Sequence, residues 1–248
     1  MKIAVINFSG NVGKTTIARH LLLPRIARAE FVAVESINAD DNQGQTLRGR
    51  QFGELQEYLQ TVESVVVDIG ASNVEELLAL MRKYRGSQDD FDCFVVPTVP
   101  ALKQQQDTIA TLVELGRLGV PASRLKLVFN MVEDDIEVSR AFDPLLTFVA
   151  ARPIAEADTR CRLGTNEIYE RVKGGGADVA ALAGDPTDYK ALIAKARTTE
   201  DKLALAQKLA TRRLAAGVLP ELDACFAALG LISEADATAN AALHTAAW

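Results

Sequence analysis

The chain has few histidine, tryptophan and cysteine residues, and its cysteines are far apart in the sequence. Its 248 residues include two histidines, one tryptophan and three cysteines. The cysteines, Cys93, Cys161 and Cys225, are odd in number and lack the spacing of metal ligands, so we expect reduced thiols of a cytoplasmic protein. His20 and His244 have no partner that indicates a catalytic triad, and we expect both at the surface or its boundary.

Long hydrophobic runs and an excess of positive charge are also missing. No apolar run approaches the roughly 20 residues that a membrane-spanning helix needs, and we expect the apolar start after Met1 to be a strand rather than a targeting segment. The formal net charge is −6, so any contact with DNA has to come from a local patch. The length suits one large α/β domain, or a domain with an extension.

The most informative stretch lies at residues 7–16, which read Asn-Phe-Ser-Gly-Asn-Val-Gly-Lys-Thr-Thr. An apolar run precedes it and an amphipathic run follows it, which predicts a strand, a glycine-containing loop and a helix. Gly13 lets the backbone curl around an anion, Lys14 can reach the β- and γ-phosphates of a nucleotide, and Thr15 can bind Mg²⁺. The residues expected to hold the nucleotide are Gly10, Asn11, Val12, Gly13, Lys14, Thr15 and Thr16.

This pattern is that of a Walker A loop with one departure. The strict motif has glycine six residues before the lysine, where this chain has Phe8. The alternative is a chance Gly-Lys-Thr at the start of a helix. The flanking strand and helix, and the second motif described next, favour the phosphate-binding loop.

A second nucleotide-type motif follows at residues 64–70. Three valines lead into Asp68, and Gly70 follows shortly after. In a P-loop fold such a strand lies beside the first strand, and its aspartate reaches the shell of the Mg²⁺ ion. The alternative is an ordinary strand that happens to end at an aspartate.

Strands and helices alternate over the first 156 residues. Further strands are expected near 31–34, 91–96 and 125–130, and helices near 102–115 and 136–146; residues 148–153 are expected to form the last strand or a loop on the adenine side. This alternation predicts a mainly parallel sheet with helices on both faces. Ligands of such sheets bind at the carboxyl ends of the strands, where we expect Lys14, Asp40, Asp68 and Asn130.

The composition changes from about residue 157. The remaining chain is rich in Ala, Leu, Lys and Arg, with helices expected near 166–172, 189–195, 200–214 and 219–229. We expect a hinge at Gly174–Gly176 and a partly disordered tail from Ser233. We therefore predict a P-loop nucleotide-binding core at 1–156 and a helical C-terminal appendage at 157–248.

These motifs together resemble the ParA/MinD group of deviant-Walker ATPases, and residues 1–40 look most like the StbB plasmid-stability family. The resemblance implies that Lys14 is the P-loop lysine, Thr15 a Mg²⁺ ligand and Thr16 an α-phosphate contact. It also implies that Asp40 positions the attacking water, that Asp68 is the Walker B residue and that Asn130 contacts adenine.

One signature residue of the resemblance is absent. The family has a lysine at the position of Ser9, and that lysine crosses a dimer interface to the partner's phosphates. Arg48 or Arg50 could replace its charge, or could be plain surface residues. No Asn-Lys-x-Asp motif follows Asn130, which favours ATP over GTP.

The resemblance implies a slow, partner-stimulated ATPase switch with ATP and Mg²⁺ as cofactors, acting in plasmid stability, partition or conjugative transfer. Its expected partners are a second copy in the presence of nucleotide, a plasmid-encoded protein, and nonspecific DNA. The DNA contact would come from the basic residues Lys190, Lys195, Arg197, Lys202, Lys208, Arg212 and Arg213. The alternative is that these residues form a solvated helix face beside acids such as Glu200 and Asp201. The alternatives are a metabolic P-loop enzyme, such as a ligase or small-molecule kinase, and a nucleotide-binding scaffold that does not hydrolyse.

Overall fold

The computed structural model describes residues 1–34, 49–133, 135–173 and 178–231. Several of the sequence-based expectations fall outside these ranges: those on Asp40, Arg48 and His244, the hinge at Gly174–Gly176, and the tail from Ser233.

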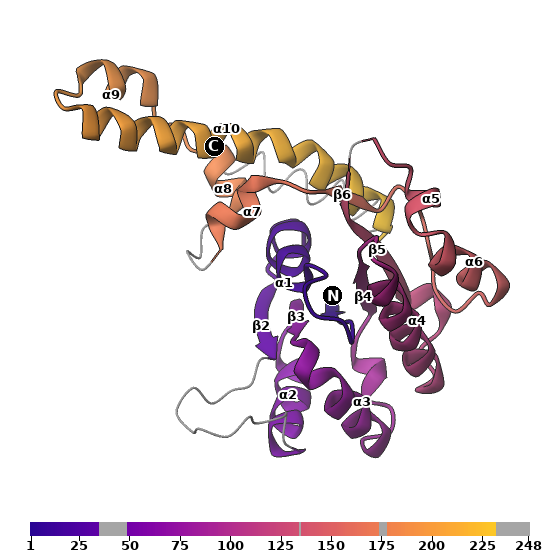
Figure 1. Cartoon of the computed structure of the whole chain (residues 1–248). Coiled ribbons are helices and arrows are strands. Elements are labelled where there is room, and N and C mark those ends of the chain that lie inside the picture. Colours follow the sequence, from indigo (N-terminus) through magenta and orange to yellow (C-terminus); the bar gives the residue numbers. More distant parts are fainter. Residues whose placement is uncertain (35–48, 134, 174–177, 232–248) are drawn as a thin grey trace.

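Six parallel strands form one sheet in the order β2-β3-β1-β4-β5-β6 (Figure 1). Along the chain they are β1 (Lys2–Val5), β2 (Glu30–Val34), β3 (Val65–Ile69), β4 (Cys93–Thr98), β5 (Leu125–Val132) and β6 (Arg162–Gly164). Strand β1 lies between β3 and β4, with Val5 in register with both Asp68 and Val95. The expected parallel α/β sheet is confirmed.

Alternating side chains of the strands point into two separate cores. Ala4 and Ile6 pack in the core under α2 (Gly49–Thr61), α3 (Val74–Lys83) and α4 (Leu102–Arg117). That core is completed by α5 (Val138–Ala141) and α6 (Asp143–Ala151). This alternation is the period of two expected for a sheet that is covered on both faces.

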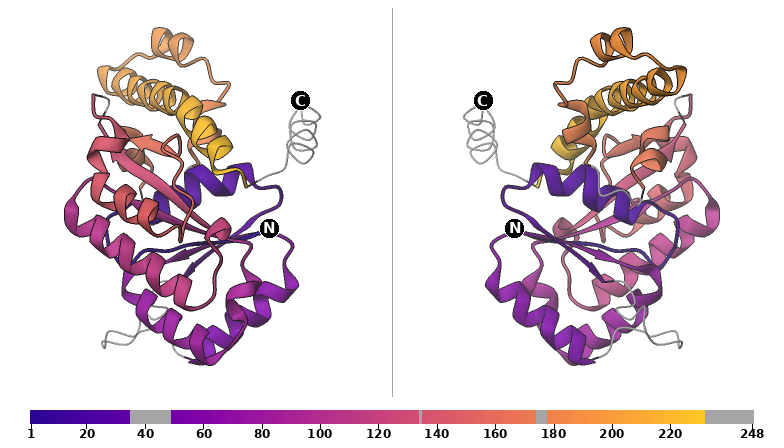
Figure 2. Two further views of the ribbon diagram at one scale, coloured as in Figure 1. Left: turned by 90° about the vertical axis from the view of Figure 1, so that its right-hand side faces the viewer. Right: turned by 90° about the vertical axis from the view of Figure 1, so that its left-hand side faces the viewer.

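Ile3 and Val5 point into the other core. There the chain runs from α1 (Lys14–Thr16) into a π-helical turn (Ile17–Leu22) and a 3₁₀ turn (Leu23–Arg25). The other helices on this face are α7 (Glu167–Val172), α8 (Val179–Ala183) and α10 (Thr199–Leu229), with α9 (Tyr189–Lys195) packed on α10. Figure 2 shows the two helical layers on either side of the sheet. Short 3₁₀ turns occupy Ala71–Asn73, Ser87–Asp90 and Ala122–Arg124.

The expectation of a last strand at residues 148–153 is wrong. Residues 148–151 are the last turn of α6, which starts next to Pro144 and buries Leu145 and Val149, four residues apart. That spacing puts both side chains on one helical face. The last strand is β6, whose three residues are too few to give a recognisable apolar alternation. The helix expected near 136–146 is two helices, α5 and α6.

The expectation of two separate helices at 200–214 and 219–229 is also wrong. α10 is one helix of 31 residues with Pro220 inside it. A proline in a helix removes one backbone hydrogen bond and normally kinks or ends it. Val218 and Leu222, on either side of Pro220, are both buried against the sheet face, and this packing offsets the loss. The short helix α8 was not expected; it begins at Val179 and is capped by Asp178, whose side chain accepts a hydrogen bond from the N–H of Ala180.

The predicted appendage contributes to the same folded body as the sheet. It supplies strand β6, and residues of α7, α8 and α10 share one hydrophobic cluster with Ile3, Val5 and Val128. The division of the chain at residue 156 stays a prediction.

All three cysteines are buried and free of disulfides. Burial raises the pKa of Cys93 and of Cys161 to about 12, so both thiols stay protonated at neutral pH. No helix within the described ranges is long and apolar enough to cross a membrane.

Replacing Leu222 by alanine tests how far α10 supports the sheet. Its side chain is fully buried, so we expect the free energy of unfolding to fall by about 2–5 kcal/mol in a single transition. Lys202→Ala, at an exposed position of the same helix, should change it by less than about 0.5 kcal/mol. Urea unfolding followed by circular dichroism measures both, and a Leu222→Ala protein as stable as wild type would contradict the assigned packing.

Candidate functional site

The candidate site lies at the carboxyl edge of the central strands. The chain leaves β1, forms the loop at residues 6–13 and enters α1 at Lys14. Because β3 pairs with β1, Asp68 near the end of β3 lies beside this loop. The strand order thus brings the two sequence motifs together, although 53 residues separate Thr15 from Asp68.

Two residues of the loop have left-handed backbone conformations. Asn11 has φ 57° and Gly13 has φ 84°. A Cβ atom on Gly13 would lie 2.1 Å from Nδ2 of Asn130, which is closer than any real contact. Glycine is therefore required at position 13 both by its backbone angle and by the close approach of β5.

Asn130 holds the loop from the side of β5. Its side chain is buried, and its Nδ2 donates to the carbonyl oxygen of Val12 at 2.9 Å. This contact was not expected, because the resemblance implied an adenine contact for Asn130. The adenine contact stays a prediction, and Asn130 does line the cleft described below.

Asn7 anchors the first half of the loop. Its Nδ2 donates to the carbonyl oxygen of Pro97 and to Oγ1 of Thr108, both at 2.8 Å, and its Oδ1 accepts from the N–H of Ser9 at 2.8 Å. Thr111 adds a further contact by accepting from the N–H of Phe8 at 3.0 Å. Sequence reasoning missed Asn7, Thr108 and Thr111; the only signal was a polar residue at the end of a fully apolar strand.

Lys14 folds back onto this anchored loop. Its Nζ donates to the carbonyl oxygens of Ser9 at 2.6 Å and of Asn7 at 3.2 Å, and the residue is only 8% exposed. Burial lowers the pKa of Lys14 to about 8, and the charge of Asp68 opposes that shift. Ser9 is also buried, so its side chain presents no group at the surface of the loop.

Thr15 and Asp68 form the second polar centre. Oγ1 of Thr15 donates to Oδ2 of Asp68 at 2.6 Å, and Asp68 is buried at the end of β3. A hydroxyl and a carboxylate are oxygen donors of the kind Mg²⁺ prefers when phosphates and water complete its shell. The pair therefore fits this ion. Within the described ranges no three His, Cys, Asp or Glu side chains gather into a metal site.

A cleft of about 1300 Å³ extends from the loop toward the last strand. One end is lined by the loop and α1, from Gly10 to Thr16, together with Gly70 and Asn130. The other end is lined by α7 and by Gly164 at the end of β6, whose N–H donates to Oε1 of Glu221 on α10 at 2.6 Å. The predicted nucleotide-binding residues thus line one continuous cleft, except Val12, which is buried behind it.

His20 is part of the wall of this cleft, and the expectation of a surface or boundary residue is wrong. It is 8% exposed, and its ring stacks on that of Tyr169 with centroids 6.0 Å apart. Burial lowers the pKa of His20, and the charge of Asp178 partly opposes this. The π-helical turn that follows the loop positions the ring. A single histidine in an amphipathic run gave no sequence signal for this position.

No protein-family model and no curated protein matches this chain. Among solved structures, it is similar to the MinD cell division protein of Aquifex aeolicus, at 12% identity and a TM-score of 0.51, over 87% of this chain and 97% of that chain. A second match is apo McdA of Cyanothece, at 13% identity and a TM-score of 0.47, over 84% of this chain and 98% of that chain. A third is the Mg-ADP complex of MinD from Pyrococcus horikoshii OT3, at 14% identity and a TM-score of 0.44, over 88% of this chain and 95% of that chain. The likeness to the Aquifex protein shows that this chain has the P-loop NTPase fold of the MinD and ParA type.

Proposed function

We propose that this chain binds ATP with Mg²⁺ and hydrolyses it slowly, as a ParA-like switch. The observation that carries the proposal is the 2.6 Å contact between Thr15 and Asp68, made directly beside the buried Lys14. A lysine, a hydroxyl and a carboxylate meet there at a left-handed glycine turn that opens a helix. These are the groups that bind a nucleoside triphosphate and its metal ion in P-loop proteins.

Each residue has one task in this proposal. The N–H groups of the loop and the start of α1 bind phosphate oxygens. Lys14 exchanges its contacts with Asn7 and Ser9 for the β- and γ-phosphates, which replaces two neutral acceptors by charged ones. Thr15 and Asp68 hold Mg²⁺, which supplies charge neutralisation on the phosphates when bound.

Hydrolysis also needs a group that orients the attacking water. We assign this role to Asp40, which follows β2 in the sequence and lies outside the described residues. Ser9 supplies no charge in place of the family's lysine. We propose that a cation of the segment after Asp40, Arg48 or Arg50, takes that role; Arg50 lies in the first turn of α2.

The biological setting is proposed from the likeness of residues 1–40 to the StbB family. It comprises plasmid stability, partition or conjugative transfer, in the cytoplasm, with a plasmid-encoded protein as partner. Nonspecific DNA is a further proposed partner. The basic residues expected to bind DNA lie on α9, on α10 and between them.

Lys14→Ala and Asp40→Ala should separate binding from turnover. Lys14 contacts phosphate in the ground state, so its removal should weaken ATP binding about ten- to a hundredfold, equivalent to roughly 1.5–3 kcal/mol. Asp40 acts in the transition state, so Asp40→Ala should bind ATP like wild type and lose turnover. Equilibrium binding of a fluorescent ATP analogue and single-turnover phosphate release measure the two effects.

Lys103→Ala is the matched control, because Lys103 is exposed and, among the residues that the structure describes, forms its ion pair with Asp107 on its own helix. It should change neither quantity. Normal ATP binding by Lys14→Ala would refute the P-loop assignment. ATP binding without any phosphate release by wild type would instead favour the non-hydrolysing scaffold.

The affinity for ATP should fall as the pH rises above about 8. The pKa of Lys14 is about 8 before binding, and the complex needs the charged form, so proton uptake accompanies binding above this pH. The phosphates are already ionised there and add no opposing change. The expected slope approaches a tenfold loss for each pH unit. Isothermal titration calorimetry between pH 7 and 9.5 measures it.

Lys14→Arg is the control for the pH experiment, because arginine keeps its charge throughout this range. Its affinity, whatever the absolute value, should not change with pH. An equally steep fall for Lys14→Arg would assign the titration to another group.

ATP with Mg²⁺ should raise the sedimentation coefficient of the protein if the proposed dimer forms. The phosphate sites of the two copies face each other in the family geometry that the resemblance implies, and bound nucleotide bridges them. We expect a concentration-dependent shift toward a dimer with ATP and a monomer with ADP. An unchanged mass with ATP would exclude the homodimer and leave either a monomeric switch or a switch that pairs with a different protein.

A further inference from the structure

A helical hairpin extends away from the nucleotide cleft. It consists of α9 and the first half of α10, which run side by side and project beyond the sheet (Figure 1; Figure 2). Residues 186–215 carry seven Lys or Arg and three Asp or Glu, in a chain whose net charge is −6. The hairpin is thus the basic part of an acidic protein.

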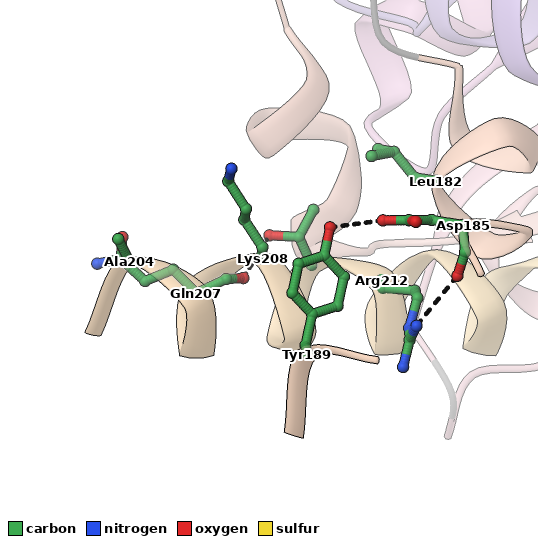
Figure 3. A pocket seen from close by; sticks show the side chains of 8 residues that line it. Leu182, Asp185, Tyr189, Ala204, Gln207, Lys208 and Arg212 are labelled. Atoms are coloured by element: carbon green, nitrogen blue, oxygen red, sulfur yellow. Dashed lines mark hydrogen bonds between the residues drawn. The ribbon is translucent and has the colours of Figure 1, made fainter. Parts of the chain in front are cut away.

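A polar network fixes the base of the hairpin (Figure 3). Asp185 accepts from the side chains of Thr187 and Tyr189, and these contacts lower its pKa to about 2. Arg212 donates to the carbonyl oxygens of Asp185 and Thr187 at 3.0 and 2.6 Å, and lies 5.2 Å from the ring centre of Tyr189. The start of α9 is therefore held in place on α10.

A groove runs along the boundary of α9 and α10. It consists of two hollows of about 420 and 430 Å³, which share Ala204 as a lining residue. The first is bounded by Leu182, Tyr189 and Lys208, and Figure 3 shows these side chains around it. The second lies nearer the tip of the hairpin.

The lining of the groove is part apolar and part polar. Its floor is formed by the apolar and aromatic side chains of Leu182, Tyr189, Leu192, Ala204 and Leu205. Lys195, Lys208 and Arg212 are its basic residues, and Asp185, Asp201, Gln207 and Thr211 are its acidic and neutral polar ones.

The side-chain ammonium groups of Lys195 and Lys208 make no ion pair or hydrogen bond with any residue that the structure describes. The two acids of the lining are already engaged: Asp185 as above, and Asp201 by the hydroxyl of Thr198 at 2.6 Å.

The hairpin is incompletely packed at its tip. α9 has only seven residues, too few for a stable isolated helix, and Tyr189 at its start is its only buried residue. Leu192 remains 42% exposed over the second hollow. An apolar groove between two fixed helices offers the seat for a third helix.

We propose that this groove binds an amphipathic helix of a partner protein, with Leu-like side chains in the floor and Asp or Glu beside them facing Lys195 and Lys208. Charge complementarity selects this occupant, since an acidic helix satisfies both lysines while its apolar stripe covers Leu192 and Leu205. Duplex DNA fits the groove itself less well, because the leucines of its floor offer nothing to phosphates. The DNA contact proposed above would use basic residues outside the lining, such as Lys190 and Lys202. No residue that lines the groove also lines the cleft beside the loop.

A designed peptide tests this proposal. The probe is a fluorescein-labelled 20-residue helix with Leu at i, i+3, i+7 and i+10 and Glu on both sides of that stripe. Two control peptides replace the Glu residues by Lys, or the Leu residues by Gln. Fluorescence anisotropy with the full chain should show saturable binding of the probe and no binding of either control peptide. Added salt should lower the affinity for the probe.

Two double variants locate the site. The double variant Lys195→Glu/Lys208→Glu should lower the affinity for the probe by at least about tenfold. Lys190→Glu with Lys202→Glu has the same charge change on the same two helices but outside the groove lining, and should weaken it less than about threefold. Unchanged helicity and ATP affinity show that each variant is folded. Leu192→Gln should lower the affinity for the probe although it changes no charge.

Three results would overturn the proposal. The first is no binding of the probe, or equal binding by both double variants. The second is that duplex DNA displaces the probe and that the affinity for DNA falls only in the Lys195/Lys208 variant. That result would make the groove a nucleic-acid surface. The third is self-association of the chain that this variant abolishes, which would make the groove an interface between copies.

Discussion

The candidate site depends on one constraint: the polar backbone groups of the loop after β1 must find partners away from water. A buried N–H or carbonyl without a partner costs about 1–3 kcal/mol. The side chain of Asn7 accepts from the N–H of Ser9, and that of Thr111 accepts from the N–H of Phe8. The side chain of Asn130 donates to the carbonyl oxygen of Val12, and that of Lys14 donates to the carbonyl oxygen of Ser9. Asn7 and Lys14 are local to the loop, but Thr111 comes from α4 and Asn130 from β5, so the loop keeps its shape only when these elements are assembled around it.

The same constraint accounts for the departure at Phe8. The strict motif uses glycine there, whereas here the ring packs against the core on the α4 side of the sheet. Its N–H is satisfied by α4 through Thr111. The first half of the loop is thus held by side-chain packing and by Asn7, while the second half keeps the glycine that its left-handed turn demands.

Local patterns in the sequence predicted most elements of the sheet and the loop residues that line the cleft. Strand, loop and helix around Gly13 are short-range features, and a run of valines ending in Asp68 identifies a buried strand. The contacts of Asn7 with β4 and α4 span about a hundred residues and left no local signal. Tertiary packing also overrode local preference at Pro220, which lies inside a helix because its neighbours are buried. At residues 148–151 an apolar run suited strand and helix equally well, and only the burial of Leu145 and Val149 on one face decides for the helix.

The length of α10 has a mechanical consequence. Oε1 of Glu221 accepts a hydrogen bond from the N–H of Gly164 at the edge of the cleft, and Ala204 lies in the groove of the hairpin 17 residues earlier on the same helix. At about 1.5 Å per residue the two points are roughly 26 Å apart on one rod. A tilt of about 5° about the cleft end displaces the groove by roughly 2 Å, by the same helical rise. The helix thus joins the edge of the cleft to the basic hairpin, and any change in its direction at the cleft end has its largest effect at the hairpin.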